Sequence, residues 1–316
     1  MEIEVRRERF RLERPFTISR GTRTHAEVLT VTLSEGGVSG RGECVPYARY
    51  GETLDSVEAE VRGWSGGPLE ELPAGAARNA LDCALWDLRA KRDGRPVWAL
   101  AGLPEPGPEV TAYTLSLGSP EAMRAQAEAN AWRPLLKVKL GTEDDVPRIE
   151  AVRAGAPKAR LVADANEGWT ADLYAEIAPV LVRLGLEMVE QPLPAGEDAA
   201  LGEMARPLPV CADESCHVTA DLDRLAGLYD MVNVKLDKTG GLTEALRLRD
   251  AAREKGFAVM VGCMVGTSLA MAPAVLAAQG AAVTDLDGPL LLAEDREPSL
   301  RFDAAGVHPA EGSLWG

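Results

Sequence analysis

The sequence has little of what secreted, membrane-spanning or metal-thiolate proteins contain. It has five cysteines without a CxxC pair, and only three histidines. The first residues, MEIEVRRERFRLERPF, alternate charged and apolar side chains without a continuous apolar run, which excludes an ordinary signal peptide. The longest weakly polar stretch, 257–280, is interrupted by Gly262, Gly266 and Pro273, so we predict core rather than a membrane span. We therefore expect free thiols and a cytoplasmic protein.

Positive charge is also scarce. The 316 residues include 34 Lys and Arg against 49 Asp and Glu, a formal net charge of −15. Such a surface repels phosphate backbones and anionic lipid heads, so we expect neither a nucleic-acid nor a membrane partner. A small-molecule substrate remains open, because a pocket sets its own local field. Hydrophobic residues make up 46% of the chain, enough for a sizeable core, and a homo-oligomer is possible.

The chain divides into parts with different patterns. Residues 1–105 combine alternating strands, such as VLTVTL at 28–33, with a helical stretch over 73–103, and predict an α+β unit. In residues 106–292, eight short apolar runs alternate with amphipathic helical stretches, which predicts an α/β barrel with a parallel sheet. The last part, 293–316, contains PSLRFDAAGVHP and is expected to return as a strand to the first domain.

Three successive runs of the barrel end in an acidic residue: Asp164 in VADAN, Glu190 in VEQP and Asp213 in ADES. They are roughly 25 residues apart, about one strand–loop–helix unit, so they should recur at the C-terminal rim of adjacent strands. Any one of them could be a solvated helix N-cap. Three carboxylates in register would repel one another without a hard cation, and Mg²⁺ takes oxygen ligands. We therefore predict a magnesium site.

Three lysines are predicted to flank these acids. Lys137 and Lys139, at i and i+2 in LLKVKL, point to the same face of a strand, and Lys235 lies about one unit after Asp213, across the barrel. Each alone could be a buried salt-bridge partner. Opposed amines, however, allow a 1,1-proton transfer: one lysine removes an α-proton and the other returns one to the opposite face of a metal-stabilised enediolate. Near a dication such a lysine should lose its proton easily. Lys238 is expected at the surface.

In this order, the PF and GEC segments, KxK, DAN, EQP, ADES and VNVKLDKTGG resemble the enolase superfamily in its muconate-lactonizing-enzyme branch, over almost the whole chain. The resemblance implies a modified TIM-type (β/α)7β barrel whose capping domain is built mainly from the N-terminus and completed by the C-terminal segment. It implies Lys139 and Lys235 as the acid/base pair, Lys137 at the substrate carboxylate, and the three strand-end acids as ligands of Mg²⁺. Histidine-based members fit poorly, because no histidine ends the seventh run.

Within this branch the chain resembles the dipeptide epimerases, chiefly through Asp285-Leu286-Asp287 at the end of the eighth run. Two carboxylates at i and i+2 point the same way and can hold the free α-ammonium of a dipeptide. A turn before Gly288-Pro289 is the plain alternative. The resemblance implies an isomerase that epimerises a dipeptide at the α-carbon of its C-terminal residue, with L-Ala-D-Glu and L-Ala-L-Glu as the expected pair in peptidoglycan recycling.

A glutamyl side chain would need a cation from the capping loops. Arg20 and Arg23 in ISRGTRTHAE are the candidates, with Arg49 behind them, although all three could be ordinary surface residues. By the resemblance, three residues near strand ends would also line the pocket: Thr114, Cys263 and Met264.

Other readings stay open. An o-succinylbenzoate synthase, a cycloisomerase or an N-acyl amino acid racemase could use the same lysines and metal, but none needs a paired acid for a substrate ammonium. A Schiff-base lyase with Lys235 as nucleophile is a different mechanism on the same barrel. A non-catalytic binding barrel is disfavoured, because burying so many charges is costly.

Overall fold

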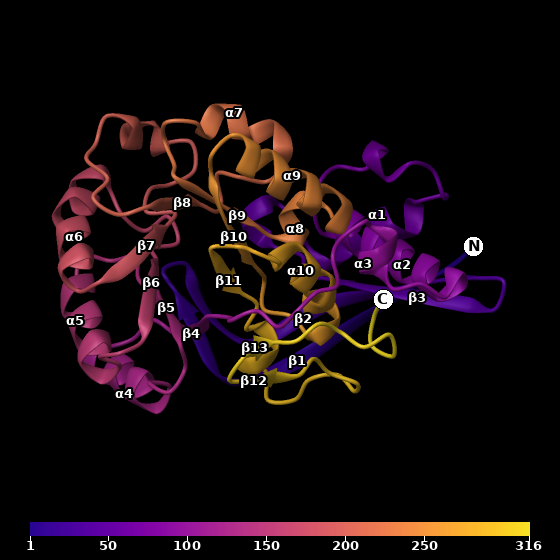
Figure 1. Cartoon of the computed structure of the whole chain (residues 1–316), viewed down its shortest axis with the longest axis horizontal. Helices are drawn as coiled ribbons and strands as arrows, with labels where there is room; N and C mark the ends of the chain where they lie inside the picture. The colour runs from indigo at the N-terminus through magenta and orange to yellow at the C-terminus, as the bar shows by residue number, and fades with distance from the viewer.

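The computed structural model describes all 316 residues, and its first part is a capping unit (Figure 1). A three-stranded antiparallel sheet has the order β1-β2-β3, with β1 (Glu2–Ile18), β2 (Gly21–Glu35) and β3 (Val38–Cys44). The helices α1 (Leu54–Gly63) and α2 (Ala76–Asp93) pack on it, and the short α3 (Val97–Leu100) follows. The alanine-rich α2 lies against β3 so closely that a Cβ at Gly42 would lie 2.1 Å from the carbonyl oxygen of Ala80. The predicted α+β unit is present.

The second part is a barrel of eight parallel strands in chain order. The strands are β4 (Tyr113–Leu115), β5 (Leu135–Lys139), β6 (Arg160–Asp164), β7 (Leu186–Glu190), β8 (Val210–Ala212), β9 (Met231–Val234), β10 (Ala258–Gly262) and β11 (Val283–Asp285). A parallel bridge between Thr111 and Thr284 joins the last strand to the segment before the first, which closes the sheet. Each of the eight predicted runs overlaps one of these strands.

Helices surround the barrel, as expected for a fold with parallel strands. They are α4 (Pro120–Ala129), α5 (Asp145–Gly155), α6 (Ala171–Arg183), α7 (Leu222–Leu225), α8 (Leu236–Thr239), α9 (Leu242–Glu254) and α10 (Ser268–Ala278). The connection from β7 to β8 has only a 3₁₀ segment, Asp198–Gly202, and β11 is followed by another, Gly288–Leu291. The fold is thus a modified (β/α)7β barrel, as predicted, with a 3₁₀ segment in place of the helix between β7 and β8. No helix is long and apolar enough to cross a membrane.

Apolar side chains fill the barrel below its C-terminal rim. One buried cluster takes a single residue from each strand or its entry: Ala112, Leu135, Val162, Met188, Cys211, Met231, Met260 and Val283. Cys211 is therefore a core residue, and all five cysteines are free thiols, as predicted. The charged residues of the same strands lie one layer above this apolar cluster, at the C-terminal rim of the barrel.

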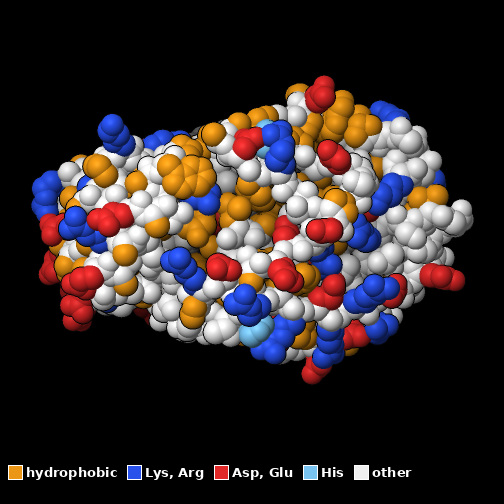
Figure 2. All heavy atoms as spheres, turned by 90° about the horizontal axis from the view of Figure 1, so that it is seen from below, with side chains coloured by type: hydrophobic (Ala, Val, Ile, Leu, Met, Phe, Trp, Pro, Cys, Tyr) orange, Lys and Arg blue, Asp and Glu red, His pale blue; other side chains and the backbone are white.

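The β1–β2 hairpin and the C-terminal segment are two of the places where the capping unit and the barrel meet. The long β1–β2 hairpin reaches the barrel, where the amide of Thr17 donates to Oγ of Ser116 at 2.7 Å. The C-terminal segment forms a short hairpin, β12 (Phe302–Asp303) and β13 (Gly306–Val307), and Val307 pairs with Glu109 instead of with the N-terminal sheet. Only its last residues reach α2, where Nε1 of Trp315 donates to the carbonyl of Cys83. On the face seen in Figure 2, acidic and basic side chains are interspersed around hydrophobic ones.

Candidate active site

A cavity of about 200 Å³ lies at the C-terminal ends of the barrel strands, below the capping unit. From the cap it is lined by residues of the β1–β2 hairpin and by Tyr47 and Tyr50. From the barrel it is lined by most of the predicted residues: Thr114, Lys137, Lys139, Asp213, Lys235, Cys263, Met264, Asp285 and Asp287. The sequence therefore predicted most of the barrel residues that line this cavity, whereas Glu214, Val265 and Leu291 of the barrel and the two tyrosines of the cap were missed.

The strand order sets how the charged groups face one another. Lys139 ends β5, Asp164 ends β6, Glu190 ends β7, Asp213 follows β8 and Lys235 follows β9. Three strands separate β5 from β9 in either direction around the closed ring of eight. The two lysines thus approach the cavity from opposite sides, and the three acids lie on the strands between them.

Each lysine ammonium is paired with a carboxylate. Nζ of Lys139 donates to Asp164 at 2.6 Å, and Nζ of Lys235 donates to Asp213 at 2.6 Å. Nζ of Lys137 lies 3.1 Å from Asp164, 2.6 Å from Glu190 and 2.7 Å from Asp285. These ammonium groups stand between the acids, so no three acidic groups meet as a ready set of metal ligands. Mutual repulsion of the carboxylates is the physical reason.

The buried charges shift one another's pKa. Burial opposes ionisation of Asp164, yet Lys139 and Lys137 keep its pKa below the usual value. Burial, and then Asp164, raise the pKa of Glu190 to about 7. Burial favours neutral Lys235, but Asp213 and Glu190 outweigh it and raise its pKa. The predicted easily deprotonated lysine therefore does not arise from the protein groups alone, because carboxylates are its nearest neighbours.

The site carries more buried acid than base, which fits a divalent cation. Four ammonium groups and the guanidinium of Arg20 face six buried carboxylates: Asp164, Glu190, Asp213, Glu214, Asp285 and Asp287. Oε2 of Glu190 is buried and accepts no hydrogen bond, and its nearest charge partner is the ammonium of Lys137, 2.6 Å away as an ion pair. Oxygen donors with surplus negative charge are what Mg²⁺ binds. Asp164, Glu190 and Asp213 would hold it.

The prediction that Lys238 lies at the surface is wrong. Instead of lying at the surface it is fully buried, because the single turn of α8 folds it back beneath the strand end. Its ammonium donates to Oδ1 of Asp213 at 2.7 Å, to the carbonyl of Asp213 at 2.6 Å and to the carbonyl of Asn233 at 2.9 Å. Lys238 therefore fixes the carboxylate of Asp213, and the i, i+3 spacing from Lys235 was the signal for it.

The predicted carboxylate pair of β11 lies in the cavity. Oδ2 of Asp285 accepts from Lys137, while its buried Oδ1 has no hydrogen-bond partner. Oδ2 of Asp287 accepts from the amide of Thr114 at 2.6 Å. Burial, and then Asp285, raise the pKa of Asp287 to about 7. A cationic ligand group would relieve this surplus of negative charge.

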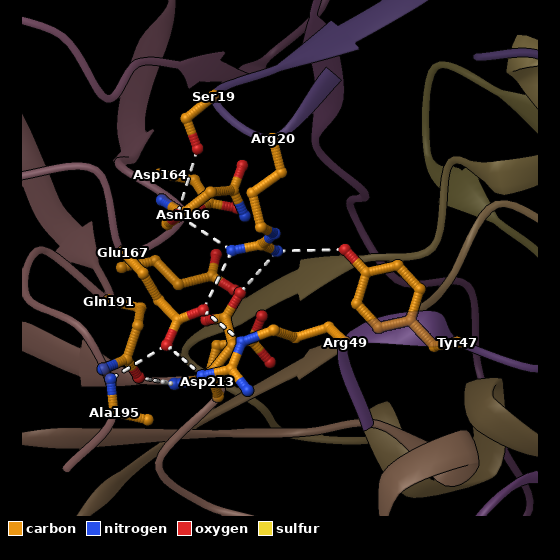
Figure 3. A network of polar contacts seen from close by, with 12 residues as sticks. Ser19, Arg20, Tyr47, Arg49, Asp164, Asn166, Glu167, Gln191, Ala195 and Asp213 are labelled. Carbon is orange, nitrogen blue, oxygen red and sulfur yellow. Dashed lines mark hydrogen bonds and ion pairs between the residues drawn. The ribbon is translucent and has the colours of Figure 1, made fainter. Parts of the chain in front are cut away.

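The two candidate arginines of the hairpin differ in their surroundings. Arg20 is committed to the protein (Figure 3): Nη1 donates to the carbonyl of Asn166 at 2.8 Å, and Nη2 to Glu214 at 2.7 Å and Tyr47 at 3.0 Å. Arg23 is exposed, lines the same cavity, and makes only a stacking contact, with its guanidinium 5.2 Å from the centre of the Tyr47 ring.

Comparison with known proteins agrees with this architecture. Residues 1–102 match the N-terminal domain of mandelate racemase / muconate lactonizing enzyme, and residues 121–304 match the enolase C-terminal domain-like model. The barrel, its cap and its charged rim thus define an enolase-type protein. The chain belongs to the mandelate racemase / muconate lactonizing enzyme family of the enolase superfamily.

Relatives within the family are similar over nearly their full length. The chain is 46% identical to the L-Ala-D/L-Glu epimerase of Escherichia coli, covering 97% of this chain and 99% of the relative. It is 42% identical to an N-acetyl-D-glutamate racemase of Pseudoalteromonas sp, covering 92% and 95%.

Solved structures of relatives contain cations and dipeptides. An enolase family member from Agrobacterium tumefaciens, with bound sodium and L-Ala-L-Glu, is 52% identical with a TM-score of 0.96 over 99% of both chains. A dipeptide epimerase from Cytophaga hutchinsonii, complexed with Mg and D-Ala-L-Val, is 28% identical with a TM-score of 0.89, covering 96% of this chain and 91% of that one.

Proposed function

We propose that this protein is a magnesium-dependent dipeptide epimerase that interconverts L-Ala-D-Glu and L-Ala-L-Glu. The observation that carries the proposal is the placement of Lys139 and Lys235 on opposite strands of one cavity that also contains Asp285 and Asp287. The similarity to an L-Ala-D/L-Glu epimerase over nearly the full length supports it.

The two lysines perform the proton transfer. When Mg²⁺ is bound, it neutralises the substrate carboxylate and stabilises the negative charge that develops there. One lysine, as the free amine, removes the α-proton, and the other, as ammonium, delivers a proton to the opposite face. Asp213 and Glu190, which raise the pKa of Lys235, would also hold the cation, and its charge would then offset theirs at this lysine. Lys137 contributes a fixed positive charge for the substrate carboxylate.

The two ends of the dipeptide are bound by different groups. Asp285 and Asp287 receive the α-ammonium, because Oδ1 of Asp285 is buried and has no protein partner. Arg23 receives the glutamyl carboxylate, because it lines the cavity and has no acidic partner, whereas Arg20 is fully engaged. Thr114, Cys263 and Met264 supply the cavity wall.

The organisation and location are part of the proposal. Residues 1–105 with 293–316 form the cap that excludes water, and 106–292 form the catalytic barrel. Contacts of Trp315 with α2 support the assignment of the C-terminal segment. A cytoplasmic location is supported by the five free thiols.

A second candidate is racemisation of an N-acylated glutamate, which the 42% identity to an N-acetyl-D-glutamate racemase favours. N-acetylglutamate has no ammonium and would leave Asp285 without a cationic partner. We therefore rank the dipeptide first.

Proton exchange tests the function. L-Ala-L-Glu and L-Ala-D-Glu are incubated separately with the protein and Mg²⁺ in deuterated water. We expect deuterium at the glutamyl α-carbon and formation of both diastereomers, whereas chelation of the metal should stop both. Lys139→Ala and Lys235→Ala should each slow interconversion by at least roughly 10²-fold.

Each single-lysine variant should still exchange the α-proton of the one diastereomer whose proton faces the remaining lysine. Lys158→Ala, at an exposed lysine, is the matched control and should be unchanged. Full interconversion in either Lys139→Ala or Lys235→Ala would contradict the two-base mechanism.

A further inference from the structure

Arg20 stands at the tip of the β1–β2 hairpin and joins it to the barrel. β1 ends at Ile18 and β2 begins at Gly21, so Ser19 and Arg20 form the turn itself. Nη1 of Arg20 and Oγ of Ser19 both donate to the carbonyl of Asn166, at 2.8 and 3.1 Å. The hairpin tip is thus fixed to a barrel loop by two side chains with one shared acceptor.

That acceptor belongs to a loop that orients one of the proposed metal ligands. The amide of Asn166 donates to Oδ1 of Asp164 at 2.9 Å. Asn166 and Glu167 have φ of 46° and 65°, a conformation that costs non-glycine residues free energy and persists only where neighbours enforce it. The two bonds to the Asn166 carbonyl are such an enforcement. They hold Asn166 on its carbonyl side, while its own amide, in the preceding peptide unit, donates to Asp164.

The same guanidinium reaches a second ligand loop. Nη2 of Arg20 donates to Glu214, the residue directly after Asp213, and Nη1 donates to Glu167 at 3.1 Å. Glu167 also pairs with Arg49 of the cap at 2.7 Å and accepts from the amide of Ala195 at 2.8 Å. Figure 3 shows these contacts converging on Arg20 and Glu167 between the cap and the loops of Asp164 and Asp213.

We propose that Arg20 is a positioning residue that couples closure of the β1–β2 hairpin tip to the arrangement of the metal ligands. With the hairpin tip closed, Arg20 holds the Asn166 and Glu214 loops in the orientation that presents Asp164 and Asp213 to the cation. The coupling is reciprocal, so metal binding must in turn favour the closed hairpin tip. The inference rests on the proposed magnesium site but not on the identity of the substrate.

The role of Arg20 requires the planar shape of its guanidinium as well as its charge. A planar guanidinium donates in several directions at once, whereas lysine places a single ammonium at the end of a flexible chain. Arg20→Lys keeps a positive charge for Glu214 but cannot bridge Glu214 and the Asn166 carbonyl together. The Arg20→Lys variant therefore distinguishes a role in bridging the two loops from a role in neutralising the charge of Glu214.

The experiment measures Mg²⁺ binding without substrate in the full-length protein. Calorimetric titration gives the dissociation constant, and hydrogen exchange of the amides in residues 16–23 gives the closure of the hairpin tip. In the unaltered protein we expect Mg²⁺ to slow this exchange. In Arg20→Lys we expect the dissociation constant to rise by about 10- to 100-fold, as for other residues that orient metal ligands, and the protection to be lost.

Arg78→Gln is the matched control. Arg78 also joins the cap to the barrel, donating to the carbonyls of Thr239 and Gly240, but it touches neither ligand loop. This variant should retain both the affinity and the metal-dependent protection, even if it is less stable.

Two results would overturn the role of Arg20: an affinity within about 2-fold of the unaltered protein in Arg20→Lys, or unchanged protection of residues 16–23. If Arg20→Lys does not fold, Ser19→Ala decides, because it removes only one bond to the Asn166 carbonyl. It should weaken Mg²⁺ binding in the same direction, and an unchanged affinity would be a refutation. If the unaltered protein binds no Mg²⁺ and exchanges no α-proton, the proposed function falls together with this role.

Discussion

At the scale of single residues, Asp285 shows how the site prepares for a cation. One of its oxygens is bound by Lys137, and the other is buried without a hydrogen-bond partner. A buried acceptor left unpaired costs free energy, and a substrate ammonium would recover it. The carboxylate pair thus favours substrates with a free α-amino group.

This leads to a prediction about substrate choice. Asp285→Asn combined with Asp287→Asn keeps the shape of both side chains but removes their charge. We expect kcat/KM for L-Ala-L-Glu to fall by about 10- to 100-fold, since hydrogen bonds to charged groups contribute about 1.5–3 kcal/mol. Any turnover of N-acetyl-L-glutamate, which lacks the ammonium, should change far less. Steady-state kinetics with both substrates checks this, and equal losses would assign the pair a structural role instead.

Some of the residues in the site could be predicted from the sequence, and others could not. Asp164, Glu190 and Asp213 could be identified because each ends an apolar run, and the strand pattern brings run ends together. Lys238 could not, because its burial depends on the single turn of α8 that returns it to Asp213. Nor could the different states of Arg20 and Arg23 be told apart, because they depend on contacts with loops far along the chain.

At the scale of elements, the close packing of α2 on β3 positions the cap. Gly42 faces α2, and a Cβ there would lie 2.1 Å from the carbonyl oxygen of Ala80 and 2.9 Å from the amide nitrogen of Ala84. Backbone atoms cannot move aside as a flexible side chain can, so an added methyl group must displace the helix.

We therefore expect Gly42→Ala to lower the free energy of unfolding by about 1–3 kcal/mol, the usual cost of overpacking. Urea denaturation followed by circular dichroism measures it. Gly63→Ala is the control, because no atom lies within 4 Å of the added Cβ and the residue ends α1 with an ordinary φ. If Gly42→Ala were as stable as Gly63→Ala, the contact between α2 and β3 would be looser than described.

Elements were predictable where their hydrophobic pattern is strong. All eight barrel strands overlap the predicted apolar runs, because a strand buried on both faces leaves a continuous apolar signal. The connection between β7 and β8 lacks an α-helix, and the C-terminal segment forms a small hairpin on Glu109. Both segments lack a strong hydrophobic period, and their conformation is set by tertiary contacts, which local propensity does not contain.

At the scale of the whole molecule, buried polar groups join the cap to the barrel beneath the active site. Oδ1 of Asp237, in α8, accepts from the amide of Val45 at 3.0 Å and from Nδ2 of Asn79 at 2.8 Å, both in the cap. Glu43 of β3 accepts from the amide of Thr267 of the barrel at 2.8 Å. The cap is therefore held by specific acceptors as well as by apolar contacts, and its attachment should respond to pH.

Asp237 provides the test of that response. Burial raises its pKa from 3.8 to about 7, against the hydrogen bonds from Val45 and Asn79. Between these two pKa values the folded chain keeps a proton that the unfolded chain has released, so the contribution of Asp237 to stability falls as the pH rises from about 4 to 7. Asp237→Asn accepts the same two hydrogen bonds without a charge, and its contribution does not change with pH.

The stability of Asp237→Asn is compared with that of the unaltered protein at pH 4 and pH 8. All samples contain saturating Mg²⁺, which holds the other carboxylates in one state. We expect the free energy of unfolding of the variant, relative to that of the unaltered protein, to increase by about 1 kcal/mol or more from pH 4 to pH 8. Urea denaturation at both pH values measures the difference, and parallel pH profiles of the two proteins would show that Asp237 is ionised in the folded chain throughout.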